Sequence, residues 1–322
     1  MLISLIIPVY NVAPYIIRCL DSVMKQDYTG SMECILVNDC SEDQSIALAQ
    51  EAIDAYSGPI CFSIIPHDRN RGLSAARNTG IEASRGDYLY FLDADDWIAS
   101  DGISAMVAMV VKFPSVEMVQ AGAIPHGGTE PWLNMQDCML PEFIQGKENV
   151  RPVMLNRDKL PVTAWNRLVR KSFLLRKNLF FQEGLIHEDE LWTFQLAMHL
   201  SSLAILRQNT YHYEHRESGL MSRPSAQKDA SLVTIAQQMI AAMDNFCIPL
   251  SVSYIADFIH LRSFNITDET QRIAMIEHIP QLYPYWSFFR KLNARMWLFM
   301  SKMPIRNHYW LYSLLYHWRI GC

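Results

Sequence analysis

The feature that most constrains the fold is an alternation, over the first 120 residues, of short apolar runs with segments of helical spacing. Segment 16–23, for example, places Ile16, Cys19, Leu20 and Val23 on one helix face. This alternation is typical of βαβ units, whose strands pair in parallel. We therefore predict an α/β fold with a mostly parallel, Rossmann-like sheet and flanking helices. The predicted strands are 2–7, 33–38, 60–65, 88–92 and 116–120.

Three carboxylates follow the fourth predicted strand, at Asp93, Asp95 and Asp96. Ligands of open α/β sheets bind outside the carboxyl ends of the strands, and carboxylate oxygens suit Mg²⁺ or Mn²⁺. The alternative is that Asp93 and Asp95 only end the strand and cap the next helix, as such residues often do. Polar residues also follow the first three strands, and this convergence favours a nucleotide and metal site.

Four segments, taken in order, carry a resemblance to a known family. They are Leu5-Ile-Ile-Pro-Val-Tyr-Asn11, Ile35-Leu-Val-Asn-Asp-Cys-Ser41, Asn70-Arg-Gly-Leu-Ser-Ala-Ala-Arg-Asn-Thr-Gly80 and Leu92-Asp-Ala-Asp-Asp-Trp97. They resemble the motifs of family 2 glycosyltransferases, which have the GT-A fold. Four ordered motifs are more specific than any one of them. The resemblance implies a transferase whose donor is a nucleotide diphosphate sugar, usually a UDP-sugar.

The same resemblance implies which residues bind the donor. An aromatic ring offers a π-face to a base, and a carboxylate accepts from the imide N–H of uracil. Taken singly, Tyr10 is also compatible with a strand-end tyrosine, and Arg77 with a helix-surface residue. Cys40 departs from the family, which more often has glycine there. By the match, the donor is bound by Pro8, Tyr10, Asn11, Asp39, Arg71, Arg77 and Asp93, and the metal, Mn²⁺ or Mg²⁺, by Asp95.

A second acidic run, His187-Glu-Asp-Glu-Leu-Trp192, begins a segment of helical spacing. Acidic residues favour the first turn of a helix, which is one interpretation. The run also resembles the family's Glu-Asp motif, which implies Asp189 as the general base and Glu188 and Trp192 as acceptor residues. Ala164-Trp-Asn-Arg-Leu168 resembles an acceptor-side stretch and adds Trp165 and Asn166. A single displacement assisted by one base predicts inversion at the anomeric carbon.

A loop after these segments resembles one that closes over the diphosphate in the family. In Tyr213-Glu-His-Arg-Glu-Ser218 the spacing from Arg to Ser is one residue shorter than in the family. The match implies Arg216 as a donor contact. His212 or His215 is a candidate metal ligand, although surface histidines are commoner.

The length of 322 residues exceeds the usual size of a single core, so a second unit is expected. We predict a GT-A domain over 1–224, with a nucleotide-sugar half (1–121) and an acceptor half (122–224). Segment 122–161 is rich in proline and is expected to be a loop-rich insertion between the sheet and the acceptor region. Residues 225–322 are predicted to form a helical region.

The last 42 residues, 281–322, carry six basic and no acidic residues and four of the eight tryptophans, in a chain of net charge −5. Aromatic residues interleaved with basic ones suit helices that lie on an anionic membrane. The alternative is a packed helical subdomain; nucleic acid is not expected, because the rest of the chain is acidic. No apolar run is long enough to span a membrane, and the cysteines fit reduced thiols. A cytoplasmic protein, peripheral at the inner face of the plasma membrane, is expected.

These patterns predict a metal-dependent inverting glycosyltransferase that acts on a lipid-linked or other surface glycan. One alternative is a sugar nucleotidyltransferase, which needs a glycine-rich phosphate loop that the segment after the first strand lacks. Another is a catalytically inactive sugar-nucleotide-binding protein of a glycan assembly complex.

Overall fold

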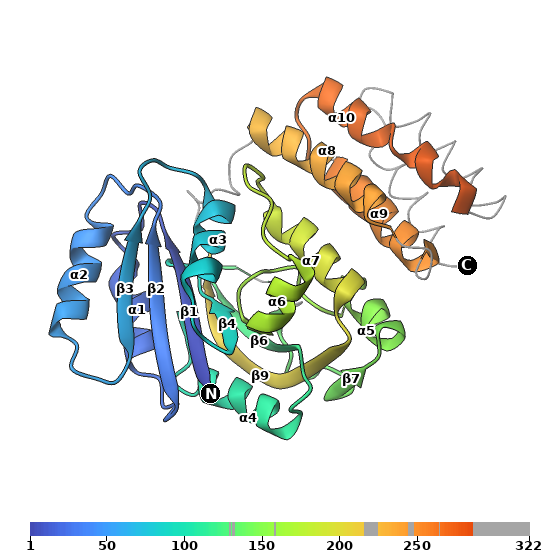
Figure 1. The fold of residues 1–322 in the computed structure, drawn as a ribbon. Coiled ribbons are helices and arrows are strands. Elements are labelled where there is room, and N and C mark those ends of the chain that lie inside the picture. The colour runs from blue at the N-terminus through green and yellow to red at the C-terminus, as the bar shows by residue number, and fades with distance from the viewer. Residues whose placement is uncertain are drawn as a thin grey trace. The chain divides into compact units, whose positions relative to one another are not determined.

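The computed structural model describes residues 1–128, 130, 133–157, 159–215, 225–243, 248–263 and 265–285 (Figure 1). The chain divides into two compact units, Met1–Ser222 and Arg223–Cys322, and each is described here by itself. Of the sequence predictions, Arg216 and residues 286–322 lie outside the described residues.

The first unit is built on one nine-stranded mixed sheet, whose first half is parallel. This part confirms the predicted βαβ pattern. Because parallel strands point the same way, the loops that follow them meet at one edge. The four parallel neighbours, in spatial order, are β3 (Cys61–Pro66), β2 (Ser31–Asn38), β1 (Leu2–Val9) and β4 (Tyr88–Phe91).

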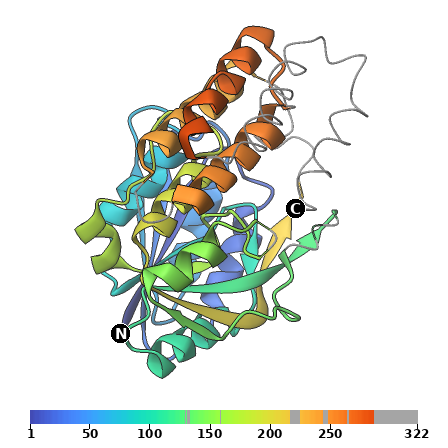
Figure 2. The same cartoon turned by 90° about the vertical axis from the view of Figure 1, so that its right-hand side faces the viewer.

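The second half of the sheet contains antiparallel pairs that the sequence pattern did not indicate. A short strand, β8, pairs antiparallel with both β4 and β6, and so lies between them. The long strand β9, yellow in Figures 1 and 2, pairs in parallel with β6 and antiparallel with β5 and β7. The bounds are β5 (Trp97–Ile98), β6 (Met118–His126), β7 (Phe143–Gln145), β8 (Arg167–Arg170) and β9 (Ser202–Glu214).

Helices cover both faces of this sheet. Residues of α1 (Ile16–Met24), α2 (Ser45–Ala55) and α4 (Gly102–Lys112) share one core with one face of the strands. On the other face, α3 (Leu73–Ala83) packs Ala76 against β2. A Cβ at Gly80 would lie 2.2 Å from a methyl carbon of Ile6, so glycine lets α3 approach β1 closely.

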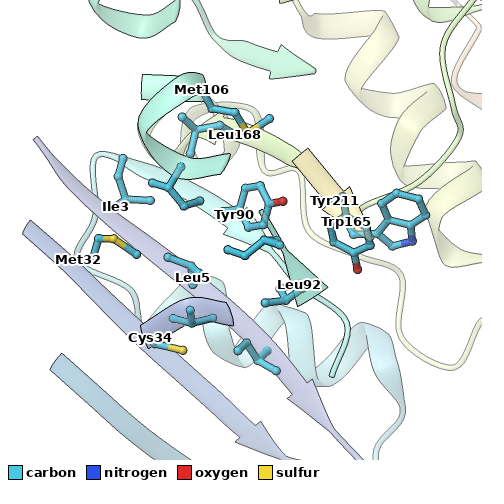
Figure 3. Packing of buried hydrophobic residues seen from close by; sticks show 14 of the residues in the cluster. Ile3, Leu5, Met32, Cys34, Tyr90, Leu92, Met106, Trp165, Leu168 and Tyr211 are labelled. Atoms are coloured by element: carbon cyan, nitrogen blue, oxygen red, sulfur yellow. The ribbon is translucent and has the colours of Figure 1, made fainter. Parts of the chain in front are cut away.

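The central strand β4 supplies side chains to both layers. Tyr88 and Tyr90, with Leu92 just beyond the strand, belong to the core that contains α1 and α4, as the close view in Figure 3 shows for Tyr90 and Leu92. Phe91 points to the opposite face, where its ring meets Trp192 at 5.7 Å between centroids. Strand β4 is therefore covered on both sides, which agrees with its uniformly apolar sequence.

Segment 122–161 contains more regular structure than its prolines indicated. It includes the end of β6, strand β7 and a helix, α5 (Lys147–Met154), whose interior holds Pro152. Two further helices complete the described part of this unit, α6 (Lys171–Lys177) and α7 (Glu188–His199). The other described residues of the segment lie in loops and turns, as the prolines indicated, and pairing with β9 stabilises a strand too short to be recognised from sequence.

The second unit consists of helices in its described part. They are α8 (Ala226–Ala241), α9 (Ile248–Ser263), α10 (Glu269–Ile276) and a 3₁₀ helix, η2 (Ile279–Tyr285). Buried Asp229 of α8 accepts N–H bonds from Thr267 and Asp268 at 3.0 Å and so holds the start of α10. None of the described helices is both long enough and apolar enough to cross a membrane.

Candidate active site

The loops that follow β2 and β3 meet at Asp39, a buried carboxylate at the sheet edge. It accepts the backbone N–H groups of Arg71 (2.8 Å) and Gly72 (2.7 Å). The Nδ1 of His67 lies 2.7 Å from the same carboxylate, and its Nε2 lies 2.9 Å from the Thr79 hydroxyl. Asp39 therefore fixes the loop that leads into α3.

The segment after β1 contributes one exposed ring. Tyr10 is 43% exposed, whereas Pro8 is buried within β1. Asn11 adopts φ 51° and its side-chain oxygen accepts the N–H of Glu42 at 2.9 Å, so it shapes the turn. Cys40 also has a left-handed φ, 62°, which explains why glycine suits that position. Among these predicted donor residues, Tyr10 and Asn11 are exposed and Pro8 is buried.

The three carboxylates after β4 have different environments. Asp96 is buried, accepts the Tyr211 hydroxyl at 2.5 Å and the Glu214 N–H at 2.7 Å, and so anchors the loop to β9. Burial, with the charges of Asp95 and Asp93, raises the pKa of Asp96 well above its usual range. Asp93 and Asp95 are partly exposed. These two carboxylates are the ones that a ligand can reach.

The first turn of α7 carries three consecutive acids, and arginines bind two of them. Arg77 donates to Glu188 at 2.5 Å, and Arg157 donates to both oxygens of Glu190, at 2.9 and 2.6 Å. Glu188 and Glu190 are buried, whereas Asp189 between them is only partly buried. Its carboxylate accepts the N–H of Glu190 at 2.9 Å. Of the three, Asp189 is the acid most accessible to an acceptor.

Arg77 also donates to Asp93, at 2.8 Å, and so brings the acid cluster and the start of α7 together. Its side chain is 2% exposed, which leaves it no surface for the direct donor contact that the sequence predicted. Arg71 is more exposed and lies 3.2 Å from Glu183 in the loop before α7. Arg71 is therefore accessible to a donor, and Arg77 is a buried link.

Like Glu188, the other three predicted acceptor residues are buried. Trp192 donates its indole N–H to the Leu179 carbonyl at 3.1 Å. Asn166 donates to the Gly122 carbonyl at 2.7 Å, and the ring of Trp165 stacks on Tyr211 at 4.4 Å, as Figure 3 shows. The side chains of Trp165, Asn166 and Trp192 therefore have protein neighbours and little exposed surface. They hold the strands and helices that surround the site.

The two candidate histidines of β9 and the loop after it have protein neighbours. The ring of His212 stacks on Trp97 with centroids 4.9 Å apart, and its Nδ1 lies 2.9 Å from the Nε2 of His126. Burial, with the nearby charges of His126 and Arg18, lowers the pKa of His212. The Nδ1 of His215 lies 3.9 Å from a Glu130 oxygen. Neither contact indicates a metal ligand.

Sequence reasoning missed two contacts that organise the site. The Tyr211–Asp96 hydrogen bond joins residues 115 positions apart, and the Arg157–Glu190 pair joins residues 33 positions apart. No local motif connects either pair. The one available signal was that Asp96, unlike Asp93 and Asp95, received no role from the family resemblance, as fits an acid with a buried partner.

Comparison with known proteins places the chain in a family. Residues 4–176 match the profile of glycosyl transferase family 2. An uncharacterized glycosyltransferase of Bacillus subtilis, EpsJ, is 29% identical over 230 residues, which are 69% of this chain and 64% of that protein. The chain thus matches less than two thirds of that relative's length. It belongs to glycosyl transferase family 2.

Solved structures agree in fold. TarS of Staphylococcus aureus, a poly(ribitol-phosphate) β-N-acetylglucosaminyltransferase, is 23% identical over 220 residues, 67% of this chain and 36% of TarS. Its residues 1–349, in complex with UDP-GlcNAc, superpose with TM-score 0.66 and 18% identity, over 100% of this chain and 92% of that one. A mannosyltransferase of Pyrobaculum calidifontis, in complex with GDP-Man and Mn²⁺, superposes with TM-score 0.56 and 16% identity. The match covers 93% of this chain and 83% of that one. These likenesses establish the fold.

Proposed function

We propose that this chain transfers a sugar from a UDP-sugar to a hydroxyl group of a glycan or lipid-linked acceptor, with inversion at the anomeric carbon. The observation that carries the proposal is the buried bridge Asp93–Arg77–Glu188. It places the first turn of α7, with Asp189, beside the sheet edge that carries the donor-binding loops. Candidate donor residues and a candidate base therefore share one site.

The donor nucleotide is assigned to the loops that follow β1, β2 and β3. Tyr10 offers its exposed ring to the base, and Asp39 fixes the loop at Arg71 and Gly72. Gly72 has φ 89°, and a Cβ built there would have no atom within 4 Å, so a phosphate can approach its backbone. The UDP-GlcNAc complex of TarS supports uracil as the base.

Asp189 is assigned as the general base. The acceptor hydroxyl gives its proton to the Asp189 carboxylate while its oxygen attacks the anomeric carbon. The bond between that carbon and the diphosphate oxygen breaks on the opposite face, so the configuration inverts. Asp189 is more exposed than Glu188 and Glu190, which supports Asp189 for this task. Retention of configuration, seen by NMR of the product, would remove Asp189 from this role.

The acids at the edge of β4 suit a divalent cation that arrives with the nucleotide. Within the part of the chain that the structure describes, no group of three or more His, Cys, Asp or Glu residues forms a ready-made metal cage. Mg²⁺ is commonly held by one or two carboxylates together with substrate phosphates, and Mn²⁺ takes the same oxygen ligands. Asp95, with Asp93 beside it, would hold such an ion, which would offset the charge of the leaving diphosphate.

Attachment to an anionic membrane surface is proposed for residues 281–322. The support is the sequence of this segment, with its six basic residues, its aromatic residues and its lack of acids. A membrane surface is where a lipid-linked acceptor would be found.

Calorimetric titration of the chain with UDP, GDP, CDP and dTDP, each with Mn²⁺ and with EDTA, tests the proposal. We expect UDP to bind in the presence of Mn²⁺ and at least about tenfold more weakly in EDTA, since the ion links the diphosphate to Asp95. Asp95→Ala should lose the Mn²⁺ effect, and Asp21→Ala, on the exposed side of α1, serves as its control. A folded chain that binds none of the four nucleotides would refute the donor assignment.

A further inference from the structure

One buried guanidinium joins the donor and acceptor sides of the site. Arg77, on α3, donates through Nη2 to Asp93 at 2.8 Å and through Nη1 to Glu188 at 2.5 Å. Its guanidinium carbon lies 5.2 Å from the centroid of the Phe181 ring. With 2% of the side chain exposed, this arginine is part of the protein interior and does not face the substrate.

The two carboxylates that Arg77 holds are neighbours of the residues assigned to the chemistry. Asp93 precedes Asp95 by two positions in the loop after β4, and Glu188 immediately precedes Asp189 at the start of α7. A change in the position of the guanidinium therefore alters the spacing between the metal-side loop and the base. The contact spans 16 residues on one side and 111 on the other.

We propose that Arg77 is a positioning residue that sets the distance between the loop carrying Asp93 and Asp95 and the helix turn carrying Asp189. This inference rests on the proposed function and deepens it: the base reaches the reacting carbon because one side chain joins the two acidic motifs. Reacting groups must be placed within a fraction of an ångström, so the length of this bridge matters for rate.

The chemistry of arginine suits the bridge. The planar guanidinium presents several N–H donors in a fixed fork, whereas a lysine ammonium is a single point charge on a flexible stem. Burial alone would lower the pKa of Arg77, but the charges of Asp93, Glu188 and Asp189 raise it, so the group stays cationic. Without the cation, the carboxylates of Asp93 and Glu188 would face each other uncompensated and separate.

The chain offers a matched comparison on the same helix turn. Arg157 binds both oxygens of Glu190, two positions beyond Glu188. Loss of Arg157 thus removes a comparable charged contact from α7 but leaves the bridge to Asp93 intact. If Arg77 acted only by stabilising α7, the two arginines would be equivalent.

The test compares Arg77→Lys, Arg77→Gln and Arg157→Gln in the full chain. Titration with UDP and Mn²⁺ counts binding-competent sites, and turnover is expressed per site. We expect Arg77→Lys to keep the UDP dissociation constant within about threefold while turnover per site falls about 100-fold. Arg157→Gln should lower turnover by less than about tenfold. This separation of binding from turnover is not produced by a loss of folded protein.

Hydrogen exchange supplies a readout that does not require turnover. Amides of peptide 186–196, at the start of α7, should exchange faster in Arg77→Lys than in the wild type, while peptide 2–9 in β1 stays unchanged. If peptide 2–9 also exchanges faster in Arg77→Gln, that variant has lost its fold. The result for Arg77→Lys then decides the test.

The proposal is overturned if Arg77→Lys turns over within threefold of the wild type, or if exchange of peptide 186–196 is unchanged in that variant. It is also overturned if Arg157→Gln and Arg77→Lys lose turnover equally. A wild-type chain that binds no nucleotide refutes the proposed function instead, and the exchange measurement still decides whether Arg77 holds α7.

Discussion

The two ends of strand β2 each bury one carboxylate, and the two carboxylates have different partners. Glu33, near the start of the strand, accepts the Ser4 hydroxyl and the backbone N–H of Arg85, both at 2.6 Å, and the Arg85 side chain at 2.9 Å. Asp39, just past the end, accepts N–H groups of the loop at Arg71 and Gly72. The contacts of Glu33 join β2 to β1 and to the segment before β4. The contacts of Asp39 fix a loop that faces a ligand.

This difference indicates how one sheet separates stability from function. At the amino ends of the strands, Glu33 accepts a hydroxyl of β1 and both the backbone N–H and the side chain of Arg85, in the segment before β4. At the carboxyl ends, Asp39 uses its oxygens to arrange backbone groups, and the side chain of Arg71 remains accessible. We expect substitutions at the first end to lower stability and substitutions at the second to lower ligand binding or turnover.

The largest effect is expected from Asp189→Asn, at the start of α7. An amide cannot take the proton of the acceptor hydroxyl, so turnover should fall about 1,000-fold while UDP affinity and thermal stability stay close to those of the wild type. Turnover is measured as UDP release with the UDP-sugar that the wild type uses. Asp21→Asn, on α1, is the isosteric control. Full turnover by Asp189→Asn would place the base elsewhere.

A middle-sized effect should separate the two ends of β2 directly. Asp39→Asn replaces one acceptor oxygen by a donor that opposes the N–H groups of Arg71 or Gly72, so UDP affinity should fall about tenfold or more. Glu33→Gln should instead lower the free energy of unfolding by about 1–2 kcal/mol and leave UDP affinity unchanged. Titration gives the UDP affinity of each variant, and urea denaturation gives its free energy of unfolding. Equal loss of UDP affinity in the two would contradict the comparison.

The stability contributed by Glu33 should also depend on pH. Burial would raise its pKa, but hydrogen bonds from Ser4 and Arg85, together with the Arg85 charge, lower it overall. Since the folded pKa is below the unfolded one, this stability is present above about pH 4.3 and is lost as the pH falls through the folded value. The melting temperature of Glu33→Gln should therefore fall less steeply than that of the wild type below about pH 4.3. Parallel curves would exclude this contribution.

The smallest effect is expected at Cys40, whose φ of 62° is costly for a residue with a Cβ. Cys40→Gly should change the free energy of unfolding by between 0 and about 1 kcal/mol in the stabilising direction, because relief of strain exceeds the added entropy of the unfolded chain. Cys61→Gly, on strand β3, lacks this relief and should destabilise by about 0.5–1 kcal/mol. A lower free energy of unfolding in Cys40→Gly would show that packing of the Cys40 side chain stabilises the fold by more than the strain costs.

The sequence predicted the parallel half of the sheet because each strand there is a separate apolar run between helices. It did not predict β8 or β7, which have four and three residues and exist through pairing with β4, β6 and β9. Short strands carry too little periodicity to be recognised alone.

The site shows the same division between local pattern and distant contact. The acids after β4 and at the start of α7 were found as motifs, since each lies within a few residues. The burial of Trp165, Asn166 and Trp192 was not predicted from the sequence, because it depends on neighbours supplied by remote elements. The position of Arg77 between two motifs likewise depends on a contact across 111 residues.

The path of the sheet has a mechanical consequence. Strand β8 follows β6 in the chain but is bonded between β4 and β6, so residues from both predicted halves, 1–121 and 122–224, are joined in one continuous ladder. Such a ladder offers no hinge about which two lobes could rotate. We therefore expect exchange of substrate and product to be timed by the loops at the strand ends, on their faster timescale, and not by domain closure.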